Sequence, residues 1–291
     1  MSIIEKNMTS LDEFWEYLSP IGPLYSEIRR PIFRGQACAD WHLTPSVFRN
    51  DIIEKYARVT SDYKRTEHVI LLEFMFIHEF LWGCDDQGIQ IPYDHSKLRE
   101  NMSFSKFIER YSDYLQGWPS EEFHPILAMV QHHGIPTRLL DWSKNPIVGM
   151  YFAASQALSL KDSDGQLAVW VIDNDENELK KVGLETISVA GSVSCNLAAQ
   201  KGLFLLHKEP QHSGHRSLFS PNDELSKIDN LLLDNEKIRA YKVTLPKKYS
   251  GELLFRCHKF NTSATTLFPG SDGVAKGVLE FQLAKRQSGK L

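Results

Sequence analysis

The chain has 291 residues, of which 42% are apolar, and this is enough to bury a sizeable core as one large domain or two small ones. Lysine and arginine total 33 against 37 acidic residues. The net charge of −4 argues against a nucleic-acid or anionic-membrane partner, although it is compatible with a local basic patch. The N-terminal residues lack the basic start and apolar run of a secretory signal, and no stretch approaches the length of a membrane span, so we expect a cytoplasmic protein without a membrane partner.

The cysteines and histidines give no metal pattern. Four scattered cysteines form no Cys-x-x-Cys pair, which favours reduced thiols over a disulfide frame or a structural zinc site (Cys38, Cys84, Cys195 and Cys257). A catalytic cysteine is compatible with this pattern, but no motif supports one. His212 and His215 have the i, i+3 spacing of a metal pair, yet no second cluster of ligands accompanies them. We therefore expect no metal.

The first part of the chain has mainly helical periodicity. Ser10 and Glu13 have the spacing of a capping box, so we expect the chain to open with a short amphipathic helix. A short extended segment follows at Pro31–Gly35. A long helical region is predicted over Glu54–Trp82, then a polar loop over residues 85–96. A further helix is predicted from apolar residues on one side (Phe104, Phe107, Ile108, Tyr111 and Leu115).

Strands dominate the later half of the predicted fold. The run LAVWVI at 167–172 is typical of a buried strand, and residues 203–206 and 240–245 offer further strands. Residues 208–222 indicate a loop, and residues 271–286 indicate a final helix. This order predicts a single α+β domain over residues 1–291, with a small mixed or antiparallel sheet. A helical insertion, at about residues 51–120, is expected between the first and second strands.

Residues 131–151, QHHGIPTRLLDWSKNPIVGMY, concentrate several features of a site. Apolar residues at helical spacing predict a helix that ends at the Gly134–Pro136 turn, because glycine can turn left-handed and proline discourages a return to helix. An extended segment is expected over Thr137–Trp142. Asn145 and Pro146 then have the pattern of an N-cap and a first helical position.

The polar side chains of this segment gather at the ends of the expected elements. There they can converge on a ligand (Gln131, His132, Arg138, Asp141 and Asn145). A structural alternative stays open, in which Asp141 and Asn145 cap a helix and Arg138 pairs with Asp141. His132 could donate to a ligand or serve as a helix cap, and Trp142 could stack on a nicotinamide ring or be buried in the core.

Four motifs in order resemble the FRG domain family, which is named for its Phe-Arg-Gly tripeptide. The first comprises Phe33, Arg34, Gly35 and Gln36, followed by Trp41, Leu43, Pro45 and Ser46. The second is QHHGIPTRLLDWSKNPIVGMYFA at 131–153, the third is AAQKGLF at 198–204, and the fourth is TTLFPGSDGVA at 265–275. These matches span about residues 25–280. Membership of the family implies a domain type more firmly than a reaction.

A more distant similarity is to the ADP-ribosyltransferase fold. Those enzymes carry an arginine on an early strand, a polar-aromatic strand followed by a helix, and a third strand with a glutamate or glutamine motif. Arg34, the Thr137–Trp142 strand and Gln200 occur in this order. The resemblance implies that Arg34 contacts the ribose or diphosphate of NAD, and that Gln200 orients the nucleophile. Because Gln200 replaces the usual glutamate, a carboxylate would have to come from Asp141 or a distant Glu.

The resemblance thus implies a catalytic set of Arg34, Asp141 and Gln200, with NAD as a substrate. It also implies a larger set that binds NAD (Arg34, Gly35, Gln36, Gln131, His132, Thr137, Arg138, Trp142 and Asn145). Two of these residues have alternative roles. Arg34 would place a fork of donors on a phosphate or tie down a loop, and Gly35 would let the backbone approach a ligand or adopt an angle that side chains forbid.

The sequence therefore leaves three alternative functions. The first is an NAD-binding enzyme similar to ADP-ribosyltransferases or NAD glycohydrolases, acting as a toxin or defence effector on an unidentified macromolecular acceptor. The second is a noncatalytic module that binds a nucleotide or another partner, which the amide at Gln200 favours. The third is a protein that acts on nucleic acid, against which the lack of basic excess counts.

Overall fold

The computed structural model describes residues 3–57, 66–111, 118–160, 164–189, 195–208, 227–233 and 235–289. His212, His215 and most of the predicted loop at 208–222 lie outside these residues. Three cysteines within them are free thiols, as predicted (Cys38, Cys84 and Cys257). Across the described ranges, no helix is both long and apolar enough to cross a membrane.

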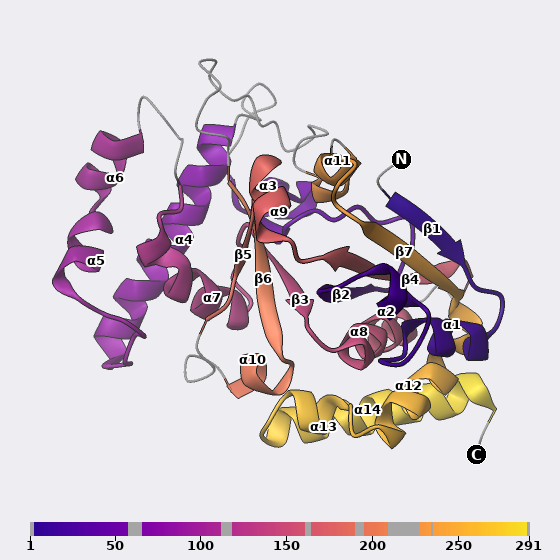
Figure 1. The fold of residues 1–291 in the computed structure, drawn as a ribbon. Helices are drawn as coiled ribbons and strands as arrows, with labels where there is room; N and C mark the ends of the chain where they lie inside the picture. The colour runs from indigo at the N-terminus through magenta and orange to yellow at the C-terminus, as the bar shows by residue number, and fades with distance from the viewer. Residues whose placement is uncertain are drawn as a thin grey trace.

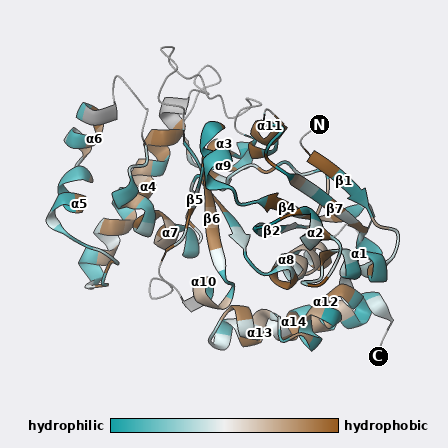
Figure 2. Ribbon diagram, in the orientation of Figure 1, coloured by the Kyte–Doolittle hydropathy of each residue, from teal (hydrophilic) through white to brown (hydrophobic). Residues whose placement is uncertain are grey.

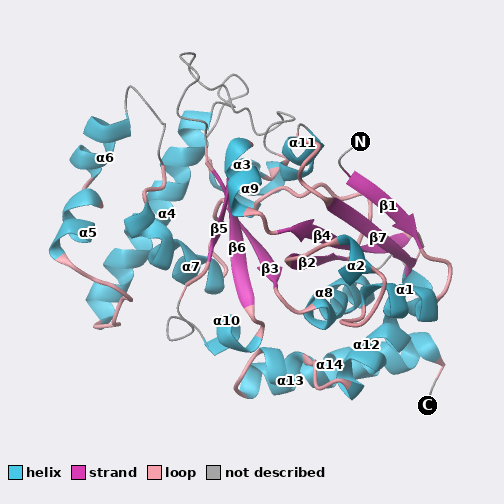
Figure 3. Cartoon of the chain, in the orientation of Figure 1, coloured by secondary structure: helices cyan, strands magenta, loops and turns pink. Residues whose placement is uncertain are grey.

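Within the described residues, the strands form a seven-stranded mixed sheet (Figure 3). Their order across the sheet is β1-β7-β4-β2-β3-β6-β5, where β1 runs parallel to β7 and the other neighbouring pairs are antiparallel. The strands are β1 (Ile3–Asn7), β2 (Pro31–Gln36), β3 (Leu139–Ser143), β4 (Gln166–Asp173), β5 (Leu184–Ile187), β6 (Gly202–His207) and β7 (Ala240–Pro246). The predicted mixed sheet is confirmed, although it is larger than the small sheet expected.

Helices surround this sheet (Figure 1). The early helices are α1 (Leu11–Leu18), α2 (Leu24–Glu27), α3 (Asn50–Tyr56), α4 (Thr66–Gln87), α5 (Ser96–Asn101), α6 (Phe104–Tyr111) and α7 (His124–His132). The later ones are α8 (Pro146–Ser159), α9 (Glu176–Lys181), α10 (Cys195–Ala199), α11 (Ile228–Leu233), α12 (Ser250–Lys259), α13 (Ala264–Leu267) and α14 (Ser271–Ser288). In Figure 1, α4 to α7 gather beside the β5 end of the sheet, and α12 to α14 lie below it.

The alternation of side chains along the strands divides the hydrophobic core into clusters on the two faces of the sheet. Val169 of β4 packs in a cluster with α8 and α12, whereas its neighbour Trp170 packs in a cluster on the opposite face, because successive strand side chains point to opposite faces. On β6, Leu203 joins the cluster of Trp170, and Phe204 joins a third cluster built with α4 and α7. The face of the sheet opposite Trp170 therefore carries two separate core clusters, that of Val169 and that of Phe204. Strands β2 and β3 lie where these two clusters meet. The central strand β4 is brown in Figure 2, in keeping with its apolar run.

Two edge strands are absent from the predicted order of elements. The chain opens with β1 and not with a helix, and β5 follows α9. Along β1, which pairs only with β7 at the sheet edge, side chains are exposed or partly exposed, so its residues carry no clear apolar alternation. Because β1 was missed, the helical insertion lies between the second and third strands, not between the first and second.

The predicted long helical region over Glu54–Trp82 is wrong as a continuous element. Ala57 is extended, with φ −81° and ψ 122°, and it ends α3. The next helix, α4, runs beyond Trp82 to Gln87, because Leu81 and Cys84 remain buried at helical spacing. Helix α4 therefore also takes up the first residues of the loop expected at 85–96.

Local sequence rules hold well elsewhere. Ser10 caps α1 by accepting the amide hydrogen of Glu13 at 3.3 Å. The Glu13 carboxylate accepts from the amide and the hydroxyl of Thr9. Asn145 caps α8 through the amide of Ile147 at 3.0 Å, as predicted. The strands expected at 167–172, 203–206 and 240–245 and the final helix are also confirmed.

Candidate functional site at the opening between β2 and β3

The sheet opens between its central strands β2 and β3. These strands are joined by a single register pair, Phe33 with Ser143, whereas β2 pairs with β4 over six residues. Beyond that pair, the backbones of β2 and β3 do not continue the ladder of hydrogen bonds, and the side chain of Arg34 connects the two strands instead. Its Nη1 donates to the backbone carbonyl oxygen of Asp141 on β3 at 2.8 Å. A positive charge therefore lies in the opening, because the two strands do not pair there.

Arg34 has unused hydrogen-bonding capacity in this position. Its side chain is 15% exposed and lies 3.8 Å from the Asp141 Oδ2 atom. The buried Nε has no hydrogen-bond partner among the described residues. Burial lowers the pKa of Arg34 to about 10, and the nearby Arg49 acts in the same direction while Asp141 opposes it. The guanidinium is still charged at neutral pH, and a buried donor without an acceptor favours an anionic or oxygen-rich ligand.

A small cavity of about 240 Å³ adjoins this arginine. The structure brings seven of the predicted site residues to its wall (Arg34, Gly35, Gln131, His132, Asp141, Trp142 and Gln200). Phe33, Val148, Phe152 and Phe268 add apolar surface. The cavity therefore combines a ring-sized apolar space with an arginine and a carboxylate, which is typical of sites that orient a small polar ligand.

Asp141 is held in place by a relay of side chains. The Gln131 Nε2 atom donates to the Asp141 Oδ1 atom at 2.8 Å. The Thr137 hydroxyl donates to Gln131 Oε1, and the amide of Leu139 donates to that hydroxyl at 3.1 Å. Thr137 itself is fully buried, so it acts through Gln131 and does not contact the cavity. The Asp141 side chain is 64% exposed and is free to face a ligand.

A second, larger cavity of about 730 Å³ adjoins the small one, and Arg34 and Gln156 line both. Its other walls include Arg49, Lys227 and the aromatic residue Trp41. The Trp41 side chain is 46% exposed, so its ring is accessible for stacking. The wall of the large cavity thus combines basic groups and an exposed aromatic ring with two acidic residues, Asp40 and Asp51.

His42 and Asp229 form a hydrogen-bonded pair at the large cavity. The His42 Nδ1 atom lies 2.6 Å from the Asp229 Oδ2 atom, and Asp229 Oδ1 accepts the amide of Leu43 at 2.8 Å. His42 lines the cavity with a half-exposed ring, whereas Asp229 is buried. A carboxylate that orients an imidazole is a common arrangement for proton transfer. Nothing in the sequence pattern joined these two residues, which are 187 positions apart.

Arg138, a predicted ligand-binding residue, lines neither cavity and pairs with the buried Glu73. Its Nε and amide nitrogen donate to the two carboxylate oxygens of Glu73 at 2.6 and 2.7 Å, and both side chains are buried. The indole of Trp118 donates to the same carboxylate at 2.9 Å. Arg138 and Asp141 are an odd number of positions apart on an extended segment and therefore point to opposite faces. The alternative pairing of Arg138 with Asp141 is therefore also absent among the contacts of the described residues.

Gly35 lines the small cavity and Gln36 lines the large one, and both of them, like Asn145, also make structural contacts. A Cβ at Gly35 would lie 2.0 Å from the carbonyl oxygen of Gly149 on α8, so the glycine permits close packing of strand and helix, not a special backbone angle. Gln36 donates to the carbonyl of His42 at 3.2 Å and accepts from the indole of Trp170 at 2.8 Å. Asn145 caps α8 and does not line the small cavity.

Gln200 lies in the turn ahead of β6 and not on the strand itself. Its carbonyl oxygen accepts the Ser143 hydroxyl at 2.7 Å, and its side-chain Nε2 donates to the carbonyl of Leu267 at 3.2 Å. These contacts fix the residue at the wall of the small cavity. His132 lies on the same wall, where burial and the neighbouring His133 lower its pKa, so its imidazole is neutral at pH 7.

Trp142 is 3% exposed and belongs to the core, with part of its surface on the small cavity. Phe152 and Phe268 lie within the second and fourth motifs but were not predicted as site residues, and the motifs did not point to Gln156 or Arg49. Phe152 and Gln156 are separated by one helical turn on α8, so the strand-helix motif carried a signal for them. In the ranges that the structure describes, no group of three or more metal-binding side chains gathers.

No curated protein and no solved structure matches the chain. The model of the FRG domain matches residues 29–162. This range contains the first two motifs and ends before Gln200 and the 265–275 motif, so it is shorter than the span of about 25–280 expected from the four motifs. It includes Arg34 and Asp141 on the two sides of the opening. The part of the chain that is similar to the FRG domain thus comprises β2, the helical insertion, β3 and α8.

Proposed function

We propose that this protein binds NAD across the two adjoining cavities and cleaves its nicotinamide–ribose bond, as an enzyme similar to ADP-ribosyltransferases or NAD glycohydrolases. The observation that carries the proposal is the position of Arg34, which is shared by both cavities and has a buried donor without a partner. A ligand with a small ring at one end and phosphates in the middle suits that arrangement. Consumption of NAD would suit a toxin or defence effector.

The two cavities differ in a way that suits the two halves of NAD. The nicotinamide ring would enter the small cavity beside Phe152 and Phe268. The diphosphate would lie at Arg34, whose Nε lacks an acceptor, with Arg49 at the edge of the large cavity. The adenine would stack on the exposed ring of Trp41. The large cavity, at about 730 Å³, has room for an ADP moiety, whereas the small one, at about 240 Å³, has not.

The chemistry assigned to the small cavity is loss of nicotinamide. The ring departs with the electron pair of its bond to the ribose carbon, which neutralises its nitrogen and leaves positive charge on the ribose. The Asp141 carboxylate, fixed by Gln131, would stabilise that charge electrostatically. Water or an acceptor group then bonds to the same carbon and loses a proton. That proton would pass to solvent, which reaches the 64% exposed Asp141 side chain beside the reacting carbon.

A noncatalytic nucleotide-binding module is the second candidate. The specific observation in its favour is that two polar side chains of the small cavity are already engaged: Gln200 donates to Leu267, and Asp141 accepts from Gln131. Neither side chain is therefore a free nucleophile. In this case the same cavities would bind the nucleotide without bond cleavage.

Calorimetric titration with NAD, ADP-ribose and nicotinamide tests whether the two cavities bind the two halves of NAD. Trp41→Ala should weaken NAD and ADP-ribose binding by about 5-fold to 150-fold, since aromatic stacking on a base contributes about 1–3 kcal/mol. It should leave nicotinamide binding unchanged. Trp82→Ala is the matched control, because Trp82 is also exposed but does not line either cavity. Absence of binding by all three compounds would refute the proposed function.

A further inference from the structure

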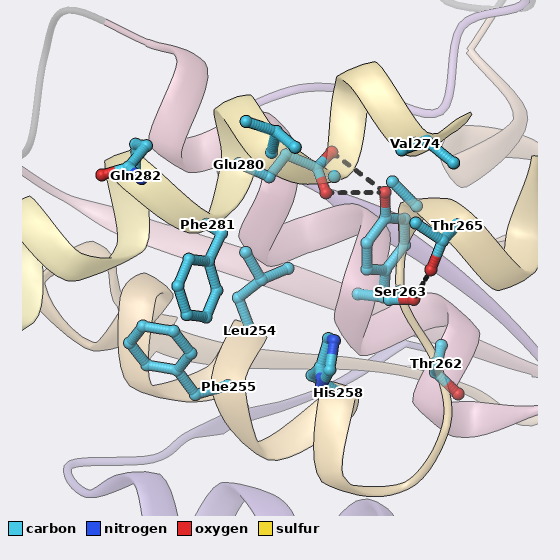
Figure 4. A pocket seen from close by; sticks show the side chains of 14 residues that line it. Leu254, Phe255, His258, Thr262, Ser263, Thr265, Val274, Glu280, Phe281 and Gln282 are labelled. Carbon is cyan, nitrogen blue, oxygen red and sulfur yellow. Dashed lines mark hydrogen bonds between the residues drawn. The ribbon is translucent and has the colours of Figure 1, made fainter. Parts of the chain in front are cut away.

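A third cavity, of about 300 Å³, lies among α12, α13 and α14 (Figure 4). Tyr151 of α8 also lines it. None of its lining residues belongs to the small or the large cavity, so it is separate from the proposed NAD site. Its position on the three C-terminal helices places it outside residues 29–162, which match the FRG domain, apart from Tyr151.

The wall of this cavity is mainly apolar and aromatic. Phe255 of α12 and Phe281 of α14 meet edge to face, with ring centroids 5.4 Å apart and an interplanar angle of 80°. Figure 4 shows both rings beside Leu254. Val274 and Val278 are 54% and 58% exposed, so they form an open apolar rim. A cavity of this size and lining suits a small organic molecule with a hydrocarbon or aromatic body.

Glu280 contributes a buried carboxylate to the same wall. It is 7% exposed, and both of its oxygens accept from the single hydroxyl of Tyr151 at 2.9 Å (Figure 4). The Lys276 Nζ atom forms a long ion pair with Oε1 at 3.9 Å, which is beyond hydrogen-bond distance. A carboxylate offers about four acceptor sites, so one phenol leaves this buried group short of donors. Burial accordingly raises the pKa of Glu280.

A buried carboxylate with one hydrogen-bond donor and only a distant ammonium group has acceptor sites left for a further donor. The rim is open to solvent, and the carboxylate and the apolar wall line the same space. We propose that this cavity is a binding site for a small organic amine, whose ammonium group donates to Glu280 and whose apolar body lies against Phe281 and Leu254. The site binds its ligand by charge at Glu280 and by shape at the aromatic pair.

The test is ligand-observed NMR and calorimetric titration with three probes, 2-phenylethylamine, tryptamine and cyclohexylmethylamine. The neutral 2-phenylethanol and the anionic 3-phenylpropanoate serve as matched ligands without the ammonium group. At least one amine should bind at least tenfold more tightly than 2-phenylethanol, and 3-phenylpropanoate should not bind. Failure of all three amines, or equal binding of the amine and the alcohol, overturns the proposal.

Variants locate the binding. Glu280→Gln, which keeps the shape of the side chain but removes its charge, should weaken the amine at least tenfold. Val274→Trp should fill the rim and abolish binding, whereas Leu279→Trp on the same helix should not, because Leu279 is 67% exposed and does not line the cavity. If Glu280→Gln fails to fold, Val274→Trp still decides the location. Amine binding that survives Val274→Trp overturns the assignment to this cavity.

Discussion

The Nη1 atom of Arg34 donates to the backbone carbonyl of Asp141 at 2.8 Å, across two central strands that share only one register pair. An arginine side chain thus bridges an opening in the sheet that backbone hydrogen bonds do not close. The same side chain lines a small and a large cavity, and its buried Nε has no partner among the described residues. The proposed NAD site depends on this relationship.

Arg34→Ala should remove thermal stabilisation by NAD. Loss of charge-assisted hydrogen bonds worth about 1.5–3 kcal/mol corresponds to a roughly 10-fold to 150-fold weaker affinity. The measurement is the shift in melting temperature with increasing NAD. Arg30→Ala is the matched control, since Arg30 is an exposed arginine on the approach to β2 and pairs with Asp175 at 3.4 Å. Equal stabilisation of the wild type and Arg34→Ala would remove Arg34 from the site.

Gly35→Ala should destabilise the fold by about 1–3 kcal/mol or more, because the new Cβ would meet the carbonyl of Gly149 at 2.0 Å and the amide nitrogen of Ala153 at 2.4 Å. Gly83→Ala provides the contrast, since its Cβ meets nothing within 4 Å and α4 gains a better helix former. That variant should be stabilised by about 0.5–1 kcal/mol. Urea unfolding measures both, and a neutral Gly35→Ala would contradict the proposed packing role.

Glu73→Gln should destabilise the protein by about 3–5 kcal/mol, because it leaves the guanidinium of Arg138 buried without its countercharge. The double variant Glu73→Leu with Arg138→Met should recover part of the loss, since it removes both charges. Both effects are read from denaturant midpoints. After correction for stability, NAD affinity should not change, because Arg138 lines neither cavity. A specific loss of affinity would restore Arg138 to the binding set.

Stability should fall as the pH decreases from about 6.5 towards 3. Burial, aided by the charge of Arg138, lowers the pKa of His207 to about 3, below the ordinary value of 6.5. Between these values the unfolded state binds a proton that the folded state does not, so acid favours unfolding, with a slope on the order of 1 kcal/mol per pH unit. His207→Gln should reduce this slope in urea titrations at several pH values. An unchanged slope would show that His207 does not titrate in this way.

The sequence predicted those parts of the fold that local rules determine. Ser10 and Asn145 occupy their expected caps, and the apolar run of β4 is a central strand. Strand β1 could not be predicted, because Ile3–Asn7 has no clear alternation and is strand only by pairing with β7, more than two hundred residues later. A long-range partner, not local propensity, determines that element.

In the candidate site, too, the sequence predicted some features, whereas others depend on contacts between distant parts of the chain. The motifs pointed to Arg34, Gln131 and Asp141, and the structure brings these three residues to one cavity. They could not separate Arg138 from these residues, because only the tertiary fold brings Glu73 against it. The pairing of His42 with Asp229 had no sequence signal for the same reason.

The most direct measurement is nicotinamide release from NAD by the purified protein, with and without cell extract as a source of acceptors. Wild-type protein should release nicotinamide, and Arg34→Ala should not, while Arg30→Ala retains the wild-type rate. Asp141→Asn should slow release with little effect on NAD affinity, because Asp141 acts on the charge that develops during bond cleavage. No release by the wild type under either condition would contradict the enzymatic account and leave the nucleotide-binding module in its place.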